Sequence, residues 1–326
     1  MPLVQLDIPF PSRISPDTDR ARLANLSWLR RHGLIRDDEA ADRYLAELFA
    51  ELVAMAWPDA TGADLDIALD MSSWSAFFDD HVNRLISQDP AQVPPLCRQL
   101  TELTHQPAGF APPAPNPFTT SWADAWARHT RGMSSNWQIR ALRSWRGYLD
   151  AHLSEADNRR RRIVPSCAEY LTVRRRACFM PVWMDLIERT GQFELPDHVL
   201  GTPHLREIQR AITDACIFIN DLHSLEKEQA CGDIHNIVII LAHHDHLAWQ
   251  QAIDEVRRIF DDRIRHFQRL RATIVTQCRL VGSADEVTWV ERYLDGLGNL
   301  ARGGHDWELF SGRYQTTAEV VSCSRP

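Results

Sequence analysis

The chain has 326 residues, of which 44% are hydrophobic and 25% charged, with a formal net charge of −8. These fractions are typical of an ordinary globular protein and exclude wholesale disorder. The acidic balance argues against nucleic acid or an anionic membrane surface as partner, and no apolar run approaches the roughly 20 residues of a membrane span.

Helical periodicity dominates the sequence. Apolar residues recur at three- and four-residue spacing over 38–55, 121–153, 203–227 and 246–275, which predicts amphipathic helices. The β-branched run 237–241 lies inside a longer helical pattern, so we predict a buried helix there. The fold class expected is all-α.

Proline and glycine mark the expected boundaries. Residues 107–117 (PAGFAPPAPNP) predict an extended connector, and 191–201 predict a loop. Gly303-Gly304 is expected to break the last helix before a short segment over 307–314. No polar linker divides the chain, so we predict one domain over 1–326. Residues 1–20 and 315–326 are expected to be flexible or to close over the site.

The N-terminus and the cysteines indicate the compartment. Residues 1–5 lack the basic-then-apolar pattern of a signal peptide, and the seven cysteines form no CxxC pair. We therefore expect a cytoplasmic protein with reduced thiols.

A first cluster of acidic side chains follows an apolar stretch. Asp79 and Asp80 come directly after Phe77 and Phe78, and Asn83 lies four residues past Asp79. On a helix, Asp79 and Asn83 share a face. Hard oxygen ligands of this kind suit Mg²⁺, although an exposed helix face would give the same pattern.

A second polar stripe lies in the helix predicted over 203–227 and its continuation. Asn220, Ser224 and Glu228 stand at i, i+4 and i+8 after an apolar run, and Lys227 lies beside them. An amide, a hydroxyl and a carboxylate make a poor core and a good cation site. A polar surface stripe remains the alternative interpretation.

Four motifs in order resemble those of the class I terpene synthases of the bacterial type. Asn220 to Glu228 matches the N-D-x-x-S-x-x-x-E motif of that family, and Asp79-Asp80 matches its aspartate-rich motif. The stretch 165–171 (PSCAEYL) followed by Arg174 is similar to its diphosphate-sensing segment. Arg313-Tyr314 resembles its C-terminal Arg-Tyr pair. These core motifs span 74–314.

Two departures from the family pattern stand out. The aspartate motif reads D-D-x-x-N, so Asn83 is expected to orient water or diphosphate. After the sensor arginine, Ala177 and Cys178 stand where the family has a helix-breaking glycine region, so the break would have to come from Pro181. Cys178 is the resulting effector candidate, and Arg175 competes with Arg174 for the sensor role.

The resemblance implies a single-domain helical bundle around a deep apolar cavity, and a carbon–oxygen lyase acting on phosphates. It implies three Mg²⁺ ions, with Mn²⁺ as a substitute, held by Asp79, Asp80, Asn220, Ser224 and Glu228. The substrate implied is a linear prenyl diphosphate, cyclised to a hydrocarbon or alcohol.

The resemblance also assigns the groups around the substrate. The catalytic groups implied are Arg174, Arg313, Tyr314 and Cys178. The substrate-binding groups implied are Asn83, Arg174, Lys227, Arg313, Tyr314, Phe77, Phe78, Trp183, Phe218 and Trp307. The aromatic members are expected to turn π faces toward passing cations, although each could equally be plain core.

Several alternatives stay open. Farnesyl diphosphate is the expected substrate, with a diterpene cyclase acting on geranylgeranyl diphosphate as the alternative and geranyl diphosphate also open. A chain-elongating prenyltransferase and a non-catalytic helical protein are the competing functions. A homodimer is a family-level expectation, and neither nucleic acid nor membrane is expected as a partner.

Overall fold

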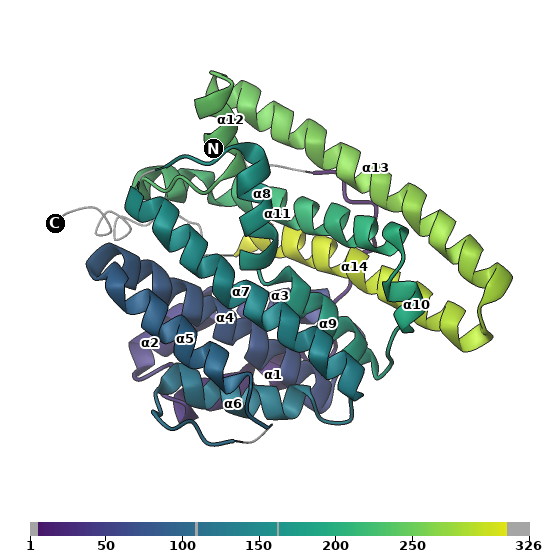
Figure 1. The fold of residues 1–326 in the computed structure, drawn as a ribbon, viewed down its shortest axis with the longest axis horizontal. Helices are drawn as coiled ribbons and strands as arrows, with labels where there is room; N and C mark the ends of the chain where they lie inside the picture. Colours follow the sequence, from purple (N-terminus) through teal and green to yellow (C-terminus); the bar gives the residue numbers. More distant parts are fainter. Residues whose placement is uncertain (1–5, 108–109, 162, 312–326) are drawn as a thin grey trace.

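A computed structural model describes residues 6–107, 110–161 and 163–311, and all regular elements in these residues are helical (Figure 1). This confirms the all-α fold class. The helices are α1 (Thr18–Arg31), α2 (Asp38–Ala46), α3 (Phe49–Ala56), α4 (Gly62–Gln88), the 3₁₀ turn η1 (Pro90–Gln92), α5 (Val93–Leu103), α6 (Pro117–His129), α7 (Ser135–Arg161), α8 (Cys167–Ala177), α9 (Met180–Gly191), α10 (Asp197–Leu200), α11 (Pro203–Cys231), α12 (Ile237–His244), α13 (Trp249–Val281) and α14 (Ala284–Phe310).

Two of the predicted helices are each divided in two. The segment predicted over 38–55 forms α2 and α3, because Leu48 between them takes a left-handed backbone with φ of 54°. The segment over 121–153 falls in α6 and α7, which are separated by a turn with Gly132 at φ of 81°. The run 237–241 is helical, as predicted, and belongs to α12.

The glycine pair near the C-terminus does not end a helix, which corrects our prediction. α14 runs through Gly303 and Gly304 to Phe310. A Cβ added at Gly303 would lie 2.9 Å from the backbone nitrogen of Ala56. Glycine is therefore needed at position 303 because α14 packs closely against α3, and the close approach outweighs its low helix propensity.

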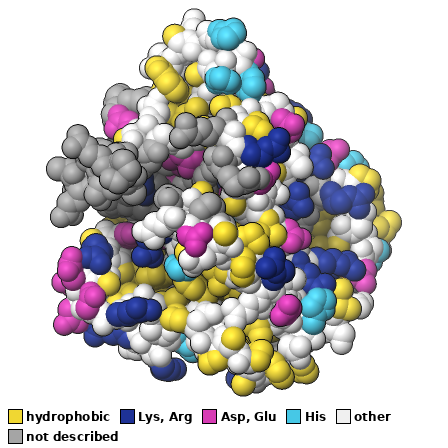
Figure 2. Space-filling view, turned by 60° about the vertical axis from the view of Figure 1, so that its left-hand side comes forward, with side chains coloured by type: hydrophobic (Ala, Val, Ile, Leu, Met, Phe, Trp, Pro, Cys, Tyr) yellow, Lys and Arg dark blue, Asp and Glu magenta, His cyan; other side chains and the backbone are white. Residues whose placement is uncertain are grey.

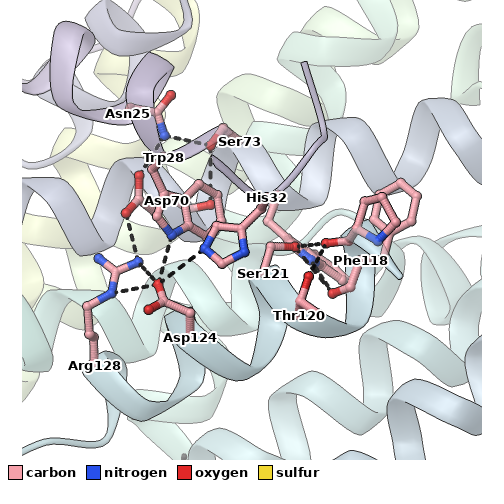
Figure 3. A network of polar contacts seen from close by, with 12 residues as sticks. Asn25, Trp28, His32, Asp70, Ser73, Phe118, Thr120, Ser121, Asp124 and Arg128 are labelled. Carbon is pink, nitrogen blue, oxygen red and sulfur yellow. Dashed lines mark hydrogen bonds and ion pairs between the residues drawn. The ribbon is translucent and has the colours of Figure 1, made fainter. Parts of the chain in front are cut away.

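A buried polar network fastens α4 to α1 and α6 (Figure 3). Asp70 of α4 accepts a hydrogen bond from Asn25 of α1 at 2.7 Å and pairs with Arg128 of α6 at 2.8 Å. Asp124 accepts from Arg128 and from the Trp28 indole, each at 2.7 Å. Burial raises the pKa of Asp70 to about 7, against the opposing effect of Arg128. The network anchors the helix that carries Asp79 and Asp80.

The helices surround one core, with α13 along one side of the bundle and α11 and α14 beside it (Figure 1). Residues 6–17 lie against this side, where Phe10 packs edge-on to Phe267 and Ser12 donates to Asp306. This part of the 1–20 segment, which we expected to flex or to cover the site, is thus anchored. Among the described residues, no helix combines the length and apolarity that a membrane crossing needs.

The face seen in Figure 2 mixes its charges. Acidic and basic side chains alternate there with patches of hydrophobic ones, and neither sign forms a broad field on that face. A nucleic-acid-binding surface normally concentrates Lys and Arg on one face. The face in view therefore offers no such concentration.

Candidate active site

A cavity of about 270 Å³ lies inside the bundle. Its walls come from α3, α4, α7, α8, α9, α11 and α14, together with the loop before α12. Apolar side chains such as Leu52, Met180 and Leu300 share the lining with the acidic residues predicted from the sequence. The cavity therefore combines an apolar wall with a set of oxygen ligands.

The first acidic motif enters this cavity from α4. Asp79, Asp80 and Asn83 all line it. Asp79 Oδ1 accepts a hydrogen bond from the Tyr148 hydroxyl at 2.5 Å and lies 3.1 Å from His152 Nε2. Both partners belong to α7, so a second helix fixes the orientation of the Asp79 carboxylate.

The second motif enters from α11. Asn220 lines the cavity, its Oδ1 accepts a hydrogen bond from Arg174 Nη2 at 2.9 Å, and its Nδ2 donates to Glu308 Oε1 at 3.1 Å. Ser224 is buried, and its hydroxyl has no hydrogen-bond partner among the described residues. A buried hydroxyl on the same helix face as Asn220 is suited to a ligand that the protein itself does not supply.

Glu228 completes this stripe, and its carboxylate is buried near two other carboxylates. Its Oε2 accepts a hydrogen bond from Asn236 Nδ2 at 2.8 Å. Burial raises the pKa of Glu228, and the nearby carboxylates of Asp221 and Asp233 raise it further. Asp233 also lines the cavity. A cation bound here would relieve this repulsion.

The donor chemistry of the cavity fits Mg²⁺. Asp79, Asp80, Asn220 and Glu228 present hard oxygen atoms, and the orphaned Ser224 hydroxyl lies on the same stripe of α11. No three His, Cys, Asp or Glu side chains in the described ranges come close enough together to hold an ion by themselves. The oxygen groups instead come from two helices, α4 and α11. Mg²⁺ typically takes one or two carboxylates and completes its shell with water and substrate phosphate.

The structure distinguishes the two candidate sensor arginines. Arg174 lines the cavity, whereas Arg175 is bound through Nε and Nη2 to Asp214 at 2.6 and 3.0 Å, alongside Arg263. Burial alone would lower the pKa of Arg174, but nearby Tyr170 and Asp221 outweigh it and hold the pKa well above its usual value. Arg174 therefore stays charged, and its buried Nε has no partner among the described residues.

The helix break after the sensor segment lies directly before Pro181, which has no N–H to donate to the carbonyl of Ala177 four residues earlier. α8 ends at Ala177, and α9 begins at Met180 with Pro181 in its first turn. Between them Phe179 takes a left-handed backbone with φ of 62°. Cys178 and Phe179 both line the cavity. Burial raises the pKa of the Cys178 thiol to about 11, so this group stays protonated.

The aromatic residues expected around the substrate divide into two groups. Trp183 and Trp307 line the cavity. Phe77, Phe78 and Phe218 do not: Phe77 contacts the Tyr44 ring, Phe78 stacks on Trp74, and Phe218 is buried in the core. The structure therefore does not place these three at the cavity, contrary to our expectation.

Lys227 also lines the cavity, next to Glu228. Arg313 and Tyr314, for which the family resemblance implied contacts to the substrate, lie outside the described residues, as does the segment 315–326. The structure therefore brings together predicted site residues from α4, α8, α9, α11 and α14.

Several residues of the site were missed in the sequence. Tyr148, His152 and Glu155 stand at i, i+4 and i+7 on α7, and the latter two line the cavity. Their spacing in the sequence could have predicted that these three polar side chains share one face of a helix. Glu308 follows Trp307 directly and also lines the cavity, but a lone glutamate after a tryptophan carries no recognisable signal.

Known proteins are similar to this chain in sequence and fold. Residues 70–266 match the family model described as terpene synthase family 2, C-terminal metal binding. The chain is 35% identical over 312 residues to a (−)-β-caryophyllene synthase of Saccharothrix espanaensis, covering 94% of this chain and 87% of that protein. It is 36% identical over 323 residues to a pentalenene synthase of Streptomyces avermitilis, covering 98% and 95%. A solved linalool/nerolidol synthase of Streptomyces clavuligerus superposes with a TM-score of 0.85 at 32% identity, covering 93% of this chain and all of that one.

Proposed function

Because this chain belongs to the terpene synthase family, whose members are lyases, we propose that it ionises and cyclises farnesyl diphosphate to a sesquiterpene hydrocarbon or alcohol. The Saccharothrix relative is described as cyclizing (2E,6E)-farnesyl diphosphate. The observation that carries the proposal is a single cavity in which Asp79, Asn220 and Glu228 meet Arg174 and an apolar wall.

The size of the cavity supports the C15 substrate over the C20 alternative. Its volume of about 270 Å³ lies just below the roughly 300–1,000 Å³ usual for ligand pockets. Geranylgeranyl diphosphate would need space for five more carbon atoms. We therefore keep farnesyl diphosphate as the proposed substrate.

In this proposal Mg²⁺ would be held by Asp79 and Asp80 on α4 and by Asn220, Ser224 and Glu228 on α11. Three ions are expected, with Mn²⁺ as a substitute. When bound, they would neutralise the charge that develops on the departing diphosphate. Tyr148 and Asn236 would orient two of these ligands through the hydrogen bonds that they donate to Asp79 and Glu228.

The remaining cationic and polar groups would bind the diphosphate itself. Arg174 presents a guanidinium that matches phosphate oxygens in a bidentate geometry. Lys227 and, from outside the described residues, Arg313 and Tyr314 would add further contacts. Asn83 lines the cavity, as does Asp79, and would bind the diphosphate directly or through a water molecule.

The apolar part of the cavity would fold the cation and exclude water. Trp183 and Trp307 would offer π faces, each stabilising a desolvated cation by about 0.5–2 kcal/mol. Cys178, a neutral thiol at the helix break, would contact the reacting end of the chain. Exclusion of water from the cavity would prevent premature quenching of the carbocation.

A diphosphate-release assay tests this proposal. Protein dialysed against EDTA is incubated with farnesyl diphosphate, and diphosphate is measured before and after Mg²⁺ is restored. We expect release only with Mg²⁺, and a loss of at least about 100-fold in Asp79→Ala and Glu228→Ala, since even groups behind a metal ligand contribute 10–100-fold. Asp150→Ala, which removes an exposed carboxylate from α7, serves as control. Release that survives EDTA and both site variants would refute the proposal.

A further inference from the structure

Glu308 is a buried carboxylate at the metal-binding stripe to which no role has been assigned. It lies in the last turn of α14, is 8% exposed, and lines the same cavity as Asn220. Burying a carboxylate is costly unless it is hydrogen-bonded or neutralised. Its Oε1 accepts a hydrogen bond from Asn220 Nδ2 at 3.1 Å, which connects the terminal helix to the proposed ligand on α11.

The contact determines which end of the Asn220 amide can reach a metal. An amide group has one accepting oxygen and one donating nitrogen, and only the oxygen can ligate Mg²⁺. Of the two ends of the amide, a carboxylate such as Glu308 can accept from the nitrogen alone, and Arg174 donates to the oxygen at 2.9 Å. Rotating the amide by 180° would place oxygen against carboxylate and nitrogen against guanidinium. Both neighbours therefore select the same orientation.

The Arg174 guanidinium and a bound metal ion would compete for the same Asn220 oxygen. In the proposed function the guanidinium binds diphosphate, and Asn220 Oδ1 exchanges the guanidinium for the metal without a flip of the amide. The hydrogen bond to Glu308 involves the other end of the amide and is compatible with both states. It is thus the contact that can hold the oxygen toward the metal after Arg174 has moved.

We propose that Glu308 is a positioning residue that keeps the Asn220 carbonyl oxygen directed at the metal site. The inference rests on the proposed function, because it takes Asn220 as a metal ligand. Glu308 acts through its hydrogen bond, so an accepting side chain of the same length should replace it. Trp307, which lines the same cavity, directly precedes Glu308 on α14.

Calorimetric titration of the full-length protein with inorganic diphosphate in the presence of Mg²⁺ tests the proposal without any turnover. Glu308→Ala should weaken diphosphate binding by about 10- to 100-fold, the usual effect of removing a group that orients a metal ligand. Glu308→Gln, whose side-chain oxygen can still accept from Asn220, should bind within about threefold of the unchanged protein. Asp306→Ala removes a carboxylate from the same turn, where it contacts Arg302 and Ser12, and should have no effect.

A second comparison separates action through Asn220 from direct ligation. In an Asn220→Ala background, adding Glu308→Ala should cause little further loss, because the contact is already gone. Equal losses in Glu308→Ala and Glu308→Gln, or a full additional loss in the double variant, would overturn the proposal. So would unchanged binding in Glu308→Ala.

Two readouts keep these results distinct from other failures. Thermal unfolding, followed by circular dichroism, verifies that each variant is folded. Absence of Mg²⁺-dependent diphosphate binding by the unchanged protein would count against the proposed function itself, whereas selective behaviour of the Glu308 variants tests only this inference.

Discussion

Neighbouring residues in one helix turn have different tasks in this protein. Arg174 and Arg175 are adjacent in sequence, yet one lines the cavity and the other pairs with Asp214, which is fully buried. Successive residues of an α-helix point about 100° apart, and that rotation separates a group facing the cavity from a group facing the core.

Substitution of each arginine by alanine should therefore give opposite results. Arg174→Ala should reduce kcat/KM by at least about 100-fold, as the charge on the leaving diphosphate loses a preorganised partner, with little change in melting temperature. Arg175→Ala should leave the buried Asp214 carboxylate with Arg263 alone and lower the free energy of unfolding by about 3 kcal/mol. Steady-state kinetics and urea unfolding measure the two quantities. A stable, inactive Arg175→Ala with an active Arg174→Ala would reverse the assignment.

The residue scale also shows where prediction from sequence stops. Asp79, Asn220 and Glu228, which motif spacing brought together, all line one cavity, because helix periodicity fixes which residues share a face. The same spacing could not predict that Phe179 lines the cavity whereas Phe78 does not. Whether an aromatic ring faces the cavity or the core depends on neighbouring helices, and on a left-handed residue at 179 that no propensity suggests.

At the scale of elements, the break between α8 and α9 shapes the cavity. Phe179 holds this break with φ of 62°, and its ring packs edge-on to Trp145 and Tyr148 with centroids 5.2 and 4.8 Å away. A left-handed backbone is costly for a residue with a side chain and clusters at functional sites. Packing of the ring offsets that strain.

Two substitutions at Phe179 separate the strain from the packing. Both Phe179→Ala and Phe179→Gly lose the ring and should destabilise the protein by about 3–5 kcal/mol. Glycine accepts positive φ without steric cost, so the glycine variant should be the more stable one by about 1 kcal/mol. This order is the reverse of that expected within a helix. Urea unfolding of the two variants measures the difference, and a more stable alanine variant would mean that the backbone relaxes out of the left-handed region.

Element boundaries were predictable only in part. Amphipathic spacing identified α11 and α13, but not the break at Leu48, which carries no glycine or proline signal. Conversely, Gly303-Gly304 gave a breaker signal where α14 continues, because glycine there serves close packing against α3. Local sequence does not reveal whether a glycine frees the backbone or clears space for a neighbouring helix.

On the scale of the whole molecule, a buried histidine ties stability to pH. His129 is fully buried between α6 and α7, its ring 4.7 Å from that of Trp137. Burial lowers the pKa of His129 to about 3, and the charge of Arg189 contributes in the same direction. The folded protein thus holds this group neutral, whereas the unfolded chain protonates it below about 6.5.

His129→Phe should change the pH dependence of unfolding in a defined direction. Because the folded pKa lies below the unfolded one, the stabilisation is complete above about pH 6.5 and is lost as the pH falls toward 3. The free energy of unfolding of the unchanged protein should therefore fall relative to that of His129→Phe, with a slope of up to about 1.4 kcal/mol per pH unit. Urea unfolding at pH 7.5, 6 and 5 measures this, and parallel curves for the two proteins would contradict it.

The whole-molecule account rests on a single cavity shared by a cation site and an apolar wall of limited volume. Its most direct test is incubation of the purified protein with Mg²⁺ and geranyl, farnesyl or geranylgeranyl diphosphate separately, with gas chromatography–mass spectrometry of the organic extract. We predict a cyclic C15 hydrocarbon or alcohol from farnesyl diphosphate, absent when EDTA is added. Only linear alcohols at the level of a protein-free control, or a cyclic product from geranylgeranyl diphosphate alone, would contradict the account.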